Sequence, residues 1–265
     1  MAYEIRKKTI SSYSRWHKDA GFSYLVTTNN AKTIKGKGYL TSIVHFSPHK
    51  LAGVVVDGKR VSVCGKATPE CIGACLNASG HTEMNMKRLD VKSDPARDKR
   101  TRLLFEQPEV FKELLVRELD RDARKAEREG LIHVIRLNGT SDIRWEDVFP
   151  EVFDMYGQVY DYTKYDPDER KPPSNYDLTY SDNGDHDRTE RLLKDGHRVA
   201  VVFGLMKGGI LPDTWRGFKV IDGDLDDLTF TKPKGVVLGL RIKGQSNRSK
   251  LRTGTMKLGG FVVAA

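Results

Sequence analysis

Short apolar runs with strand character alternate with helical segments along most of this chain. Alternation of this kind, at intervals of roughly 20–30 residues, is typical of parallel β/α units. Strands are expected at residues 132–137, 159–163, 176–181, 198–203, 218–221 and 235–242, with helices at 108–130, 145–156 and 189–193. No glycine-rich nucleotide-binding motif follows a strand, so a doubly wound nucleotide-binding fold has no support. The sequence therefore predicts an α/β fold, a full or partial β/α barrel with parallel strands.

The chain of 265 residues is predicted to form a single domain, residues 1–265. Residues 1–60 are read as a β-rich N-terminal segment packed on it, with a strand at 39–46 and a hairpin that turns at Asp57-Gly58. Residues 61–83 are a cysteine-bearing loop near the N-terminal third, with a short helix at 71–77. Residues 84–265 hold the β/α units, and the proline-containing stretch 166–175 is expected to be a loop.

The balance of charges favours an anionic partner. Lys and Arg number 45 against 36 Asp and Glu, which gives a net charge of +9. An excess of this size favours contact with nucleic acid or a nucleotide. A basic protein whose charge has no specific partner fits equally well, because acidic and basic residues are interspersed. Residues 87–102 form the densest basic segment, with Lys87, Arg88, Lys92, Arg97, Lys99, Arg100 and Arg102.

The sequence carries no sign of membrane insertion or secretion. No apolar run approaches the roughly 20 residues of a membrane-spanning helix. Residues 1–18 are polar and lack the apolar stretch of a signal peptide. The expected location is cytoplasmic, without a membrane partner.

The only three cysteines, Cys64, Cys71 and Cys75, are spaced C-x6-C-x3-C. Their odd number and crowding argue against a disulfide framework and favour metal binding. Three thiolates can hold three irons of a [4Fe-4S] cluster and leave the fourth open to a small molecule. Zinc is the main alternative, with His81 as fourth ligand. The third possibility is that the three cysteines bind no metal.

Polar residues follow several expected strands, where β/α proteins place their ligand sites. The residues expected to bind a cofactor or substrate are Asn138, Ser141, Asp142, Asp161, Lys164, Asp222, Asp224 and Lys243. Residues 138–142 also fit a turn that caps the next helix. Asp222-Gly223-Asp224 is interpreted as an acidic turn in preference to a metal site. No residue is predicted to be catalytic.

Seven segments in this order resemble the gene product 88 family of bacteriophages and related mobile elements. They are SPHKLAG at 47–53, TPECIGACLN at 68–77, KRTRLLF at 99–105, RLNGTSDI at 136–143, YDYTK at 160–164, VIDGD at 220–224 and GVVLGL at 235–240. The resemblance covers about residues 35–263. It implies a phage origin and the host-cell cytoplasm, and it says little about activity.

The order of cysteine loop, basic segment and polar strand end also resembles radical S-adenosylmethionine enzymes, whose usual spacing is C-x3-C-x2-C. That resemblance implies a [4Fe-4S] cluster on the three cysteines, with S-adenosylmethionine bound at the open iron and cleaved to a radical. The predicted function is a phage-encoded iron–sulfur enzyme of this kind, acting on an unknown, nucleic-acid-related substrate. The alternative is a non-enzymatic nucleic-acid-binding phage protein that holds structural zinc on the same cysteines.

Overall fold

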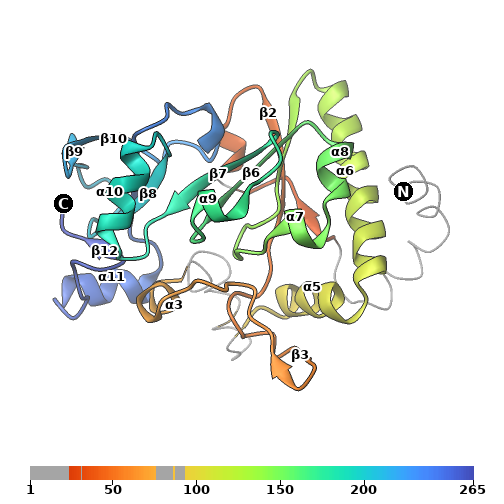
Figure 1. Cartoon of the computed structure of the whole chain (residues 1–265), viewed down its shortest axis with the longest axis horizontal. Helices are drawn as coiled ribbons and strands as arrows, with labels where there is room; N and C mark the ends of the chain where they lie inside the picture. Colours follow the sequence, from red (N-terminus) through yellow and green to blue (C-terminus); the bar gives the residue numbers. More distant parts are fainter. Residues whose placement is uncertain (1–23, 31, 76–85, 87–92) are drawn as a thin grey trace. The chain divides into compact units, whose positions relative to one another are not determined.

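The computed structural model describes residues 24–30, 32–75, 86 and 93–265 (Figure 1). Several residues of the sequence analysis lie outside this part of the chain: His81, Lys87, Arg88, Lys92 and residues 1–18. The described residues fall into two compact units. The first unit comprises those within 1–65, 91–161 and 172–177, and the second comprises those within 66–90, 162–171 and 178–265.

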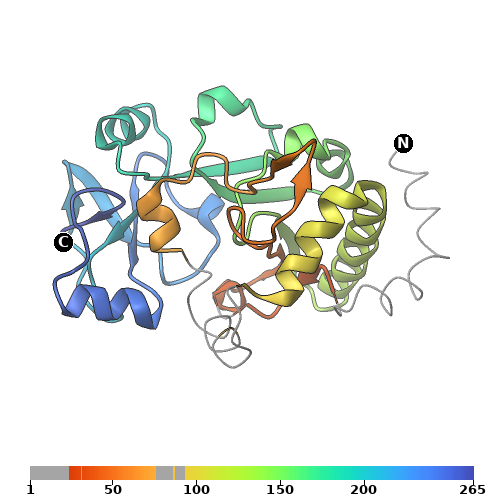
Figure 2. The same ribbon diagram turned by 90° about the horizontal axis from the view of Figure 1, so that it is seen from below.

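The first unit is a mixed α/β unit around parallel strands. Its strands are β1 (Val26–Thr27), β2 (Tyr39–Val44), β5 (Ile132–Arg136) and the first part of β6 (Gln158–Thr163), in the order β1-β2-β5-β6. The β2–β5 and β5–β6 pairs are parallel, and β1 adds to β2 antiparallel. The helical elements are η1 (Thr33–Lys35), α5 (Pro95–Glu106), α6 (Pro108–Arg128), α7 (Trp145–Val148) and α8 (Glu151–Met155). Helices α5 and α6 pack against each other (Figure 2).

Three aromatic rings form the centre of the first unit's core. Phe46, Phe111 and Trp145 are fully buried, with ring centroids 5.8–6.0 Å apart. Phe46 follows β2, Phe111 lies in the first turn of α6, and Trp145 begins α7. The amphipathic pattern of α6 thus packs where helical periodicity predicts.

Glu118 on α6 anchors the edge strand β1. Its carboxylate accepts hydrogen bonds from the backbone N–H groups of Leu25 at 3.0 Å and Val26 at 2.8 Å. The side chain is buried at 1% exposure. One buried carboxyl therefore satisfies the backbone donors of the first strand residue and of the residue before it.

The hairpin predicted around Asp57-Gly58 is confirmed. Strands β3 (Val55–Val56) and β4 (Lys59–Arg60) pair antiparallel. Asp57 and Gly58 both have positive φ, 49° and 73°, which is the backbone geometry of a two-residue I′ turn.

The second unit is also mixed α/β with a mostly parallel sheet. Its strand order is β7 (Tyr176–Ser181), β8 (Val199–Phe203), β11 (Val237–Arg241), β10 (Phe218–Asp222) and β9 (Thr214–Trp215), with β12 (Val262–Val263) pairing β8. Every pairing in this list is parallel except β9–β10. Its helical elements are α3 (Pro69–Gly73), α9 (Pro167–Arg170), α10 (His186–Lys194), η3 (Thr229–Thr231) and α11 (Gln245–Arg252). A buried cluster that includes Tyr180, Leu192 and Phe203 joins α10 to the sheet.

The α/β class and the parallel strands are confirmed, whereas a closed barrel is not shown. The strand order of the first unit ends at β1 and that of the second at β9, and neither order returns to its own start among the described pairings. In both places the last strand is antiparallel to its neighbour. Closure requires every strand to be paired on both sides.

Four local predictions need correction. Helix α5 was not predicted, although Asp94 caps it by accepting from the N–H groups of Ala96 and Arg97 and Pro95 occupies its first turn. The helix expected at residues 145–156 is split into α7 and α8 because Pro150 cannot donate a helical hydrogen bond. The loop expected at 166–175 contains the short helix α9. Helix α3 begins at Pro69, two residues before the predicted start, because the Thr68 hydroxyl caps it.

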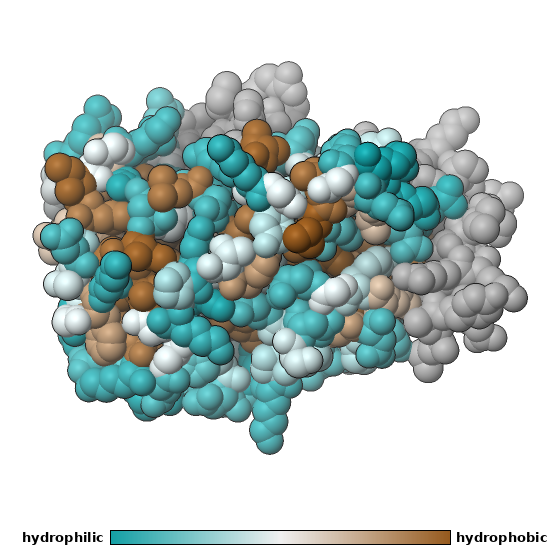
Figure 3. Space-filling view, turned by 90° about the horizontal axis from the view of Figure 1, so that it is seen from above, coloured by the Kyte–Doolittle hydropathy of each residue, from teal (hydrophilic) through white to brown (hydrophobic). Residues whose placement is uncertain are grey.

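The surface is mixed in polarity. On the face drawn in Figure 3, apolar residues occur in separate groups among hydrophilic ones. Across the described parts of the chain, no helix combines the length and apolar character that crossing a bilayer requires.

Candidate functional site

The polar loop after β5 is organised by a buried asparagine. Asn138 Oδ1 accepts hydrogen bonds from Ser141 Oγ at 2.7 Å and Ile143 N at 2.9 Å, and Trp145 Nε1 lies 3.3 Å away. Its Nδ2 donates to Ile143 O at 2.9 Å. These hydrogen bonds join the Asn138 side chain to other residues of the same loop. They hold residues 139–142 in a fixed conformation at the carboxyl end of β5.

The carboxylate of Asp161 on β6 supports the same loop. It is fully buried, and its carboxylate accepts from Asn138 N at 2.8 Å and from the Tyr176 hydroxyl at 2.8 Å. Arg136 Nε lies 3.9 Å from its Oδ1. The structure thus brings Asn138 and Asp161 into contact with each other, and these contacts position the loop within the protein.

Cys64 lies against this loop. A parallel β-bridge joins Cys64 to Asp142, and Asp142 N donates to Val63 O at 2.7 Å. The Cys64 sulfur accepts from His49 N at 3.4 Å and lies 3.9 Å from Thr140 O. The structure therefore brings one predicted metal ligand to the loop that carries Ser141 and Asp142, at the carboxyl ends of parallel strands, where ligands of α/β proteins bind.

Gly139 is required for this arrangement. A Cβ at this position would lie 2.6 Å from Val44 O and 2.8 Å from the His45 ring. Its N–H also donates to Val44 O at 2.9 Å. The loop can approach the end of β2 this closely only without a side chain.

We expect Gly139→Ala to lower the free energy of unfolding by about 1–3 kcal/mol, because backbone and ring must move to accept the methyl group. Gly157→Ala is the control, since a Cβ there meets nothing within 4 Å. Urea denaturation of both variants measures the difference. Equal midpoints for the two variants would contradict the close approach.

Cys71 and Cys75 lie on and just after helix α3, in the second unit. Cys71 N donates to the capping hydroxyl of Thr68 at 3.2 Å, and Cys75 N donates to Ile72 O at 3.3 Å. The segment is further held by Asn247, whose Nδ2 donates to Ala74 O at 3.3 Å. All three cysteines are partly exposed.

Three thiols form a donor set that suits iron or zinc. Cys64 belongs to the first unit, and Cys71 and Cys75 belong to the second. Within residues 24–30, 32–75, 86 and 93–265, no three His, Cys, Asp or Glu side chains gather as a metal site. The chemistry of the donors thus fits a metal, and their assembly around one remains a prediction.

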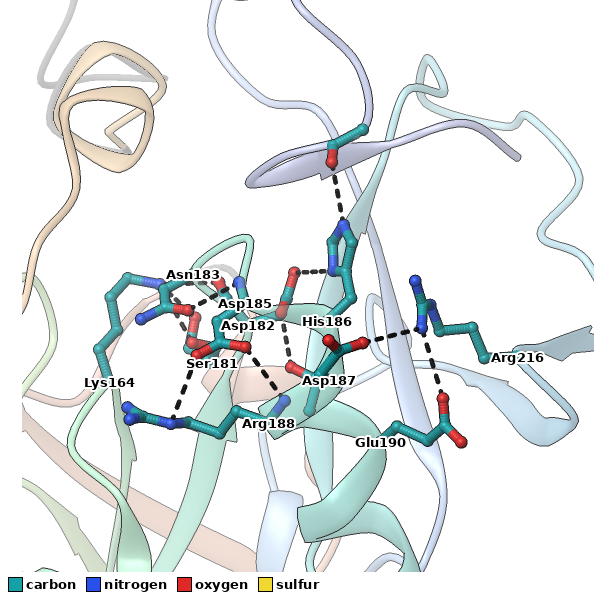
Figure 4. A network of polar contacts seen from close by, with 12 residues as sticks. Lys164, Ser181, Asp182, Asn183, Asp185, His186, Asp187, Arg188, Glu190 and Arg216 are labelled. Atoms are coloured by element: carbon teal, nitrogen blue, oxygen red, sulfur yellow. Dashed lines mark hydrogen bonds and ion pairs between the residues drawn. The ribbon is translucent and has the colours of Figure 1, made fainter.

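Lys164 is buried at the strand ends of the second unit (Figure 4). Its ammonium donates to Ser181 O at 3.2 Å, to Ser181 Oγ at 3.0 Å and to Asp182 O at 3.0 Å. The Phe261 ring lies 4.6 Å from the nitrogen. These contacts tie the segment after β6 to the end of β7.

The acidic turn after β10 is neutralised by two cations. The Arg241 guanidinium contacts Asp222 at 2.9 Å and Asp224 at 3.4 Å, and Lys243 Nζ lies 3.0 Å from Asp224. These charge-assisted bonds raise the pKa of Arg241, the bond to Asp222 being the largest cause. Two protein cations therefore contact the carboxylates of Asp222 and Asp224, which a divalent ion at this turn would also need.

A carboxylate–imidazole pair in the second unit was not among the predicted site residues. Asp182 follows β7 directly, accepts from the Thr189 hydroxyl at 2.6 Å, and places its Oδ2 3.4 Å from His186 Nδ1 (Figure 4). His186 Nε2 lies 3.1 Å from Gly259 O. The rule that polar residues follow strands would have found Asp182, whereas the partner on α10 is apparent only in the fold.

Comparison with known proteins gives one match. The family model described as gene product 88 matches residues 24–255, which is most of the chain. Neither a curated protein nor a solved structure matches. The match lends no support to the second resemblance, to radical S-adenosylmethionine enzymes. The chain belongs to the gene product 88 family.

Proposed function

We propose that Cys64, Cys71 and Cys75 bind one [4Fe-4S] cluster and that the protein is a phage-encoded iron–sulfur protein. The observation that carries the proposal is the position of Cys64, joined by a β-bridge to Asp142 at the carboxyl ends of parallel strands. A ligand near this thiol would meet the hydroxyl-rich and acidic loop 139–142. Three thiolates leave one iron without a cysteine ligand, where a small molecule can bind.

The finer proposal is a radical-SAM-like enzyme with an unknown, nucleic-acid-related substrate. When bound and reduced, such a cluster supplies one electron to S-adenosylmethionine. The residues of this chain would position the ligand: Asn138 and Asp161 hold the loop rigid, and Ser141 and Asp142 lie on it. A rigid polar loop beside the cofactor site is what positioning requires.

A nucleic-acid-binding protein with structural zinc on the same cysteines is the second candidate. Helix α5 favours it, because this helix carries Arg97, Lys99, Arg100 and Arg102 within two turns. Basic residues on one helix supply the phosphate contacts that dominate nucleic-acid affinity. In this case the metal would stabilise the cysteine segment and take part in no reaction.

Metal analysis of anaerobically purified protein distinguishes the two candidates. We expect about four irons with matching sulfide per chain, and loss of most of that iron in Cys64→Ser, Cys71→Ser and Cys75→Ser. Thr68→Ser is the control, because it keeps the cap of α3 and all three thiols. Cleavage of S-adenosylmethionine by the reduced protein then tests the enzymatic proposal.

The outcomes separate cleanly. One zinc per chain, lost in the same cysteine variants, would overturn the cluster and favour the second candidate. Failure to retain either metal, in purified and in anaerobically reconstituted protein, would overturn both. Iron without cleavage of S-adenosylmethionine would leave an iron–sulfur protein and remove the radical-SAM-like activity.

A further inference from the structure

The β3–β4 hairpin extends from the first unit with both of its faces exposed. Residues 55–60, which form the two strands and the turn between them, are all exposed, and Figure 1 shows the hairpin extending past α5. Val55 is 57% exposed and Val56 is 41% exposed. Adjacent residues on a strand point to opposite faces. The ribbon therefore packs neither face against the parts of the chain that the structure describes.

Each face of the ribbon combines one valine with one cation. The register pairs Val55 with Arg60 and Val56 with Lys59. Cross-strand partners lie on the same face of a two-stranded ribbon. Both cations are exposed, and no hydrogen bond or ion pair joins either side chain to another described residue. One positive charge thus extends from each side of the ribbon.

The base of the hairpin is fixed to the first unit. Val54 and Val63, on either side of it in the chain, are buried. Val61 N donates to Val54 O at 3.0 Å, which adds one cross-strand bond below β3 and β4. Arg102 on α5 donates to Ala52 O at 2.7 Å. The exposed tip is therefore held in a defined place, and a preorganised element loses little conformational freedom when it binds a partner.

The charge of the tip favours an anionic partner. Residues 55–60 carry two cations against the single carboxylate of Asp57, and the exposed Lys50 lies in the turn that precedes the hairpin. Segments that bind membrane surfaces bury aromatic rings or leucines in the lipid boundary, and residues 55–60 include neither. Charge complementarity thus points to a nucleic acid in preference to a lipid surface.

We propose that the β3–β4 hairpin inserts into the major groove of duplex DNA. Three residues lead from the buried Val54 to the turn at Asp57, a rise of about 10 Å at about 3.3 Å per residue. The major groove is about 8.5 Å deep and about 12 Å wide, and it admits a two-stranded ribbon. Phosphates line both walls of the groove, so Lys59 and Arg60, on opposite faces, can each contact one wall. The two valines would then meet sugars and base edges.

This contact requires no metal and goes beyond the proposed function. It also differs from the phosphate contacts of α5, because it belongs to a separate element. Metal content measured on the same samples keeps a failure of the hairpin contact distinct from a failure of the proposed cluster.

The test is a titration of a short labelled DNA duplex of mixed sequence, followed by fluorescence anisotropy at several concentrations of potassium chloride. The double variant Lys59→Gln with Arg60→Gln should weaken binding about tenfold and reduce the slope of log affinity against log salt by about 1.8, since each phosphate contact contributes about 0.9. Lys35→Gln with Lys37→Gln is the matched control. It removes the same charge from exposed residues that precede β2, whereas the hairpin follows β2.

Two further arms test how the hairpin binds. Val55→Ser with Val56→Ser keeps the charge, so it should weaken DNA binding and leave the salt slope unchanged. Duplex RNA of the same sequence should bind more weakly than DNA, because the deep, narrow major groove of A-form RNA does not admit side chains. Vesicles of phosphatidylserine and phosphatidylcholine provide the lipid comparison.

Four results would overturn the proposal. They are the absence of salt-dependent binding of the wild-type protein to duplex DNA, an equal loss in the hairpin and control variants, unchanged affinity in the valine variant, and equal affinity for duplex DNA and duplex RNA. Binding to vesicles that the hairpin variants abolish, with DNA binding intact, would assign the hairpin to a membrane surface and overturn it as well. Thermal melts confirm that each variant folds, and Arg60→Gln alone replaces the double variant if that one does not.

Discussion

Asp161→Ala is expected to lower the free energy of unfolding by about 3–5 kcal/mol. The carboxylate is fully buried and accepts from Asn138 N and the Tyr176 hydroxyl, each at 2.8 Å. Its removal leaves two buried donors unsatisfied and takes away a carboxylate that lies 3.9 Å from Arg136 Nε. Urea denaturation followed by tryptophan fluorescence measures the change, because Trp145 packs beside the same loop.

Tyr176→Phe is the matched control for this prediction. It removes one of the two 2.8 Å bonds and leaves the carboxylate in place, so about 1 kcal/mol should be lost. The loss of unfolding free energy in Asp161→Asn should fall between those of Asp161→Ala and Tyr176→Phe, because an amide oxygen can still accept from Asn138 N. A loss below about 1 kcal/mol in Asp161→Ala would show that the carboxylate does not organise the loop.

Glu118 is expected to make the protein's stability depend on pH. Burial is the main cause that raises its pKa to about 7, against the two backbone hydrogen bonds and Arg121, which lower it. The folded state therefore binds this proton more tightly than the unfolded state. The stabilisation is complete below the ordinary glutamate pKa and is lost as the pH rises through about 7.

The comparison with Glu118→Gln isolates this effect. Glutamine does not ionise. Between pH 4 and pH 8 the free energy of unfolding of the wild type should therefore fall by about 3 kcal/mol relative to that of the variant, which is the pKa shift converted to energy. The lost carboxylate bonds to Leu25 and Val26 add a constant offset to the difference. Glu127→Gln, on the exposed side of the same helix, is the control. A difference that is constant across this range would contradict the raised pKa.

The sequence predicted those elements whose signals are local. Hydrophobic periodicity identified α6, and the Asp57-Gly58 pair identified the β3–β4 hairpin. Helix α5 was missed because its sequence is dominated by charge and lacks an apolar stripe, although Asp94-Pro95 is a recognisable start. The split between α7 and α8 follows from Pro150, which lacks the N–H that a continuous helix would need.

The candidate site was predicted only in part. The rule that polar residues follow strands found Asn138, Asp161 and Lys164, and it could not say that all three would be buried. The role of Arg241 as the partner of Asp222 was likewise invisible, because nothing in the local sequence relates two residues on different strands.

The sequence by itself determined the α/β class, the parallel strand segments, the family and the three thiols as candidate metal ligands, since these depend on local periodicity, motif order and residue type. Only the tertiary structure decided that Cys64 pairs with Asp142 and that Asp161 holds the loop of Asn138. The physical reason is that these contacts join residues far apart in the chain. Their hydrogen bonds and charges exist only after β2, β5 and β6 align side by side.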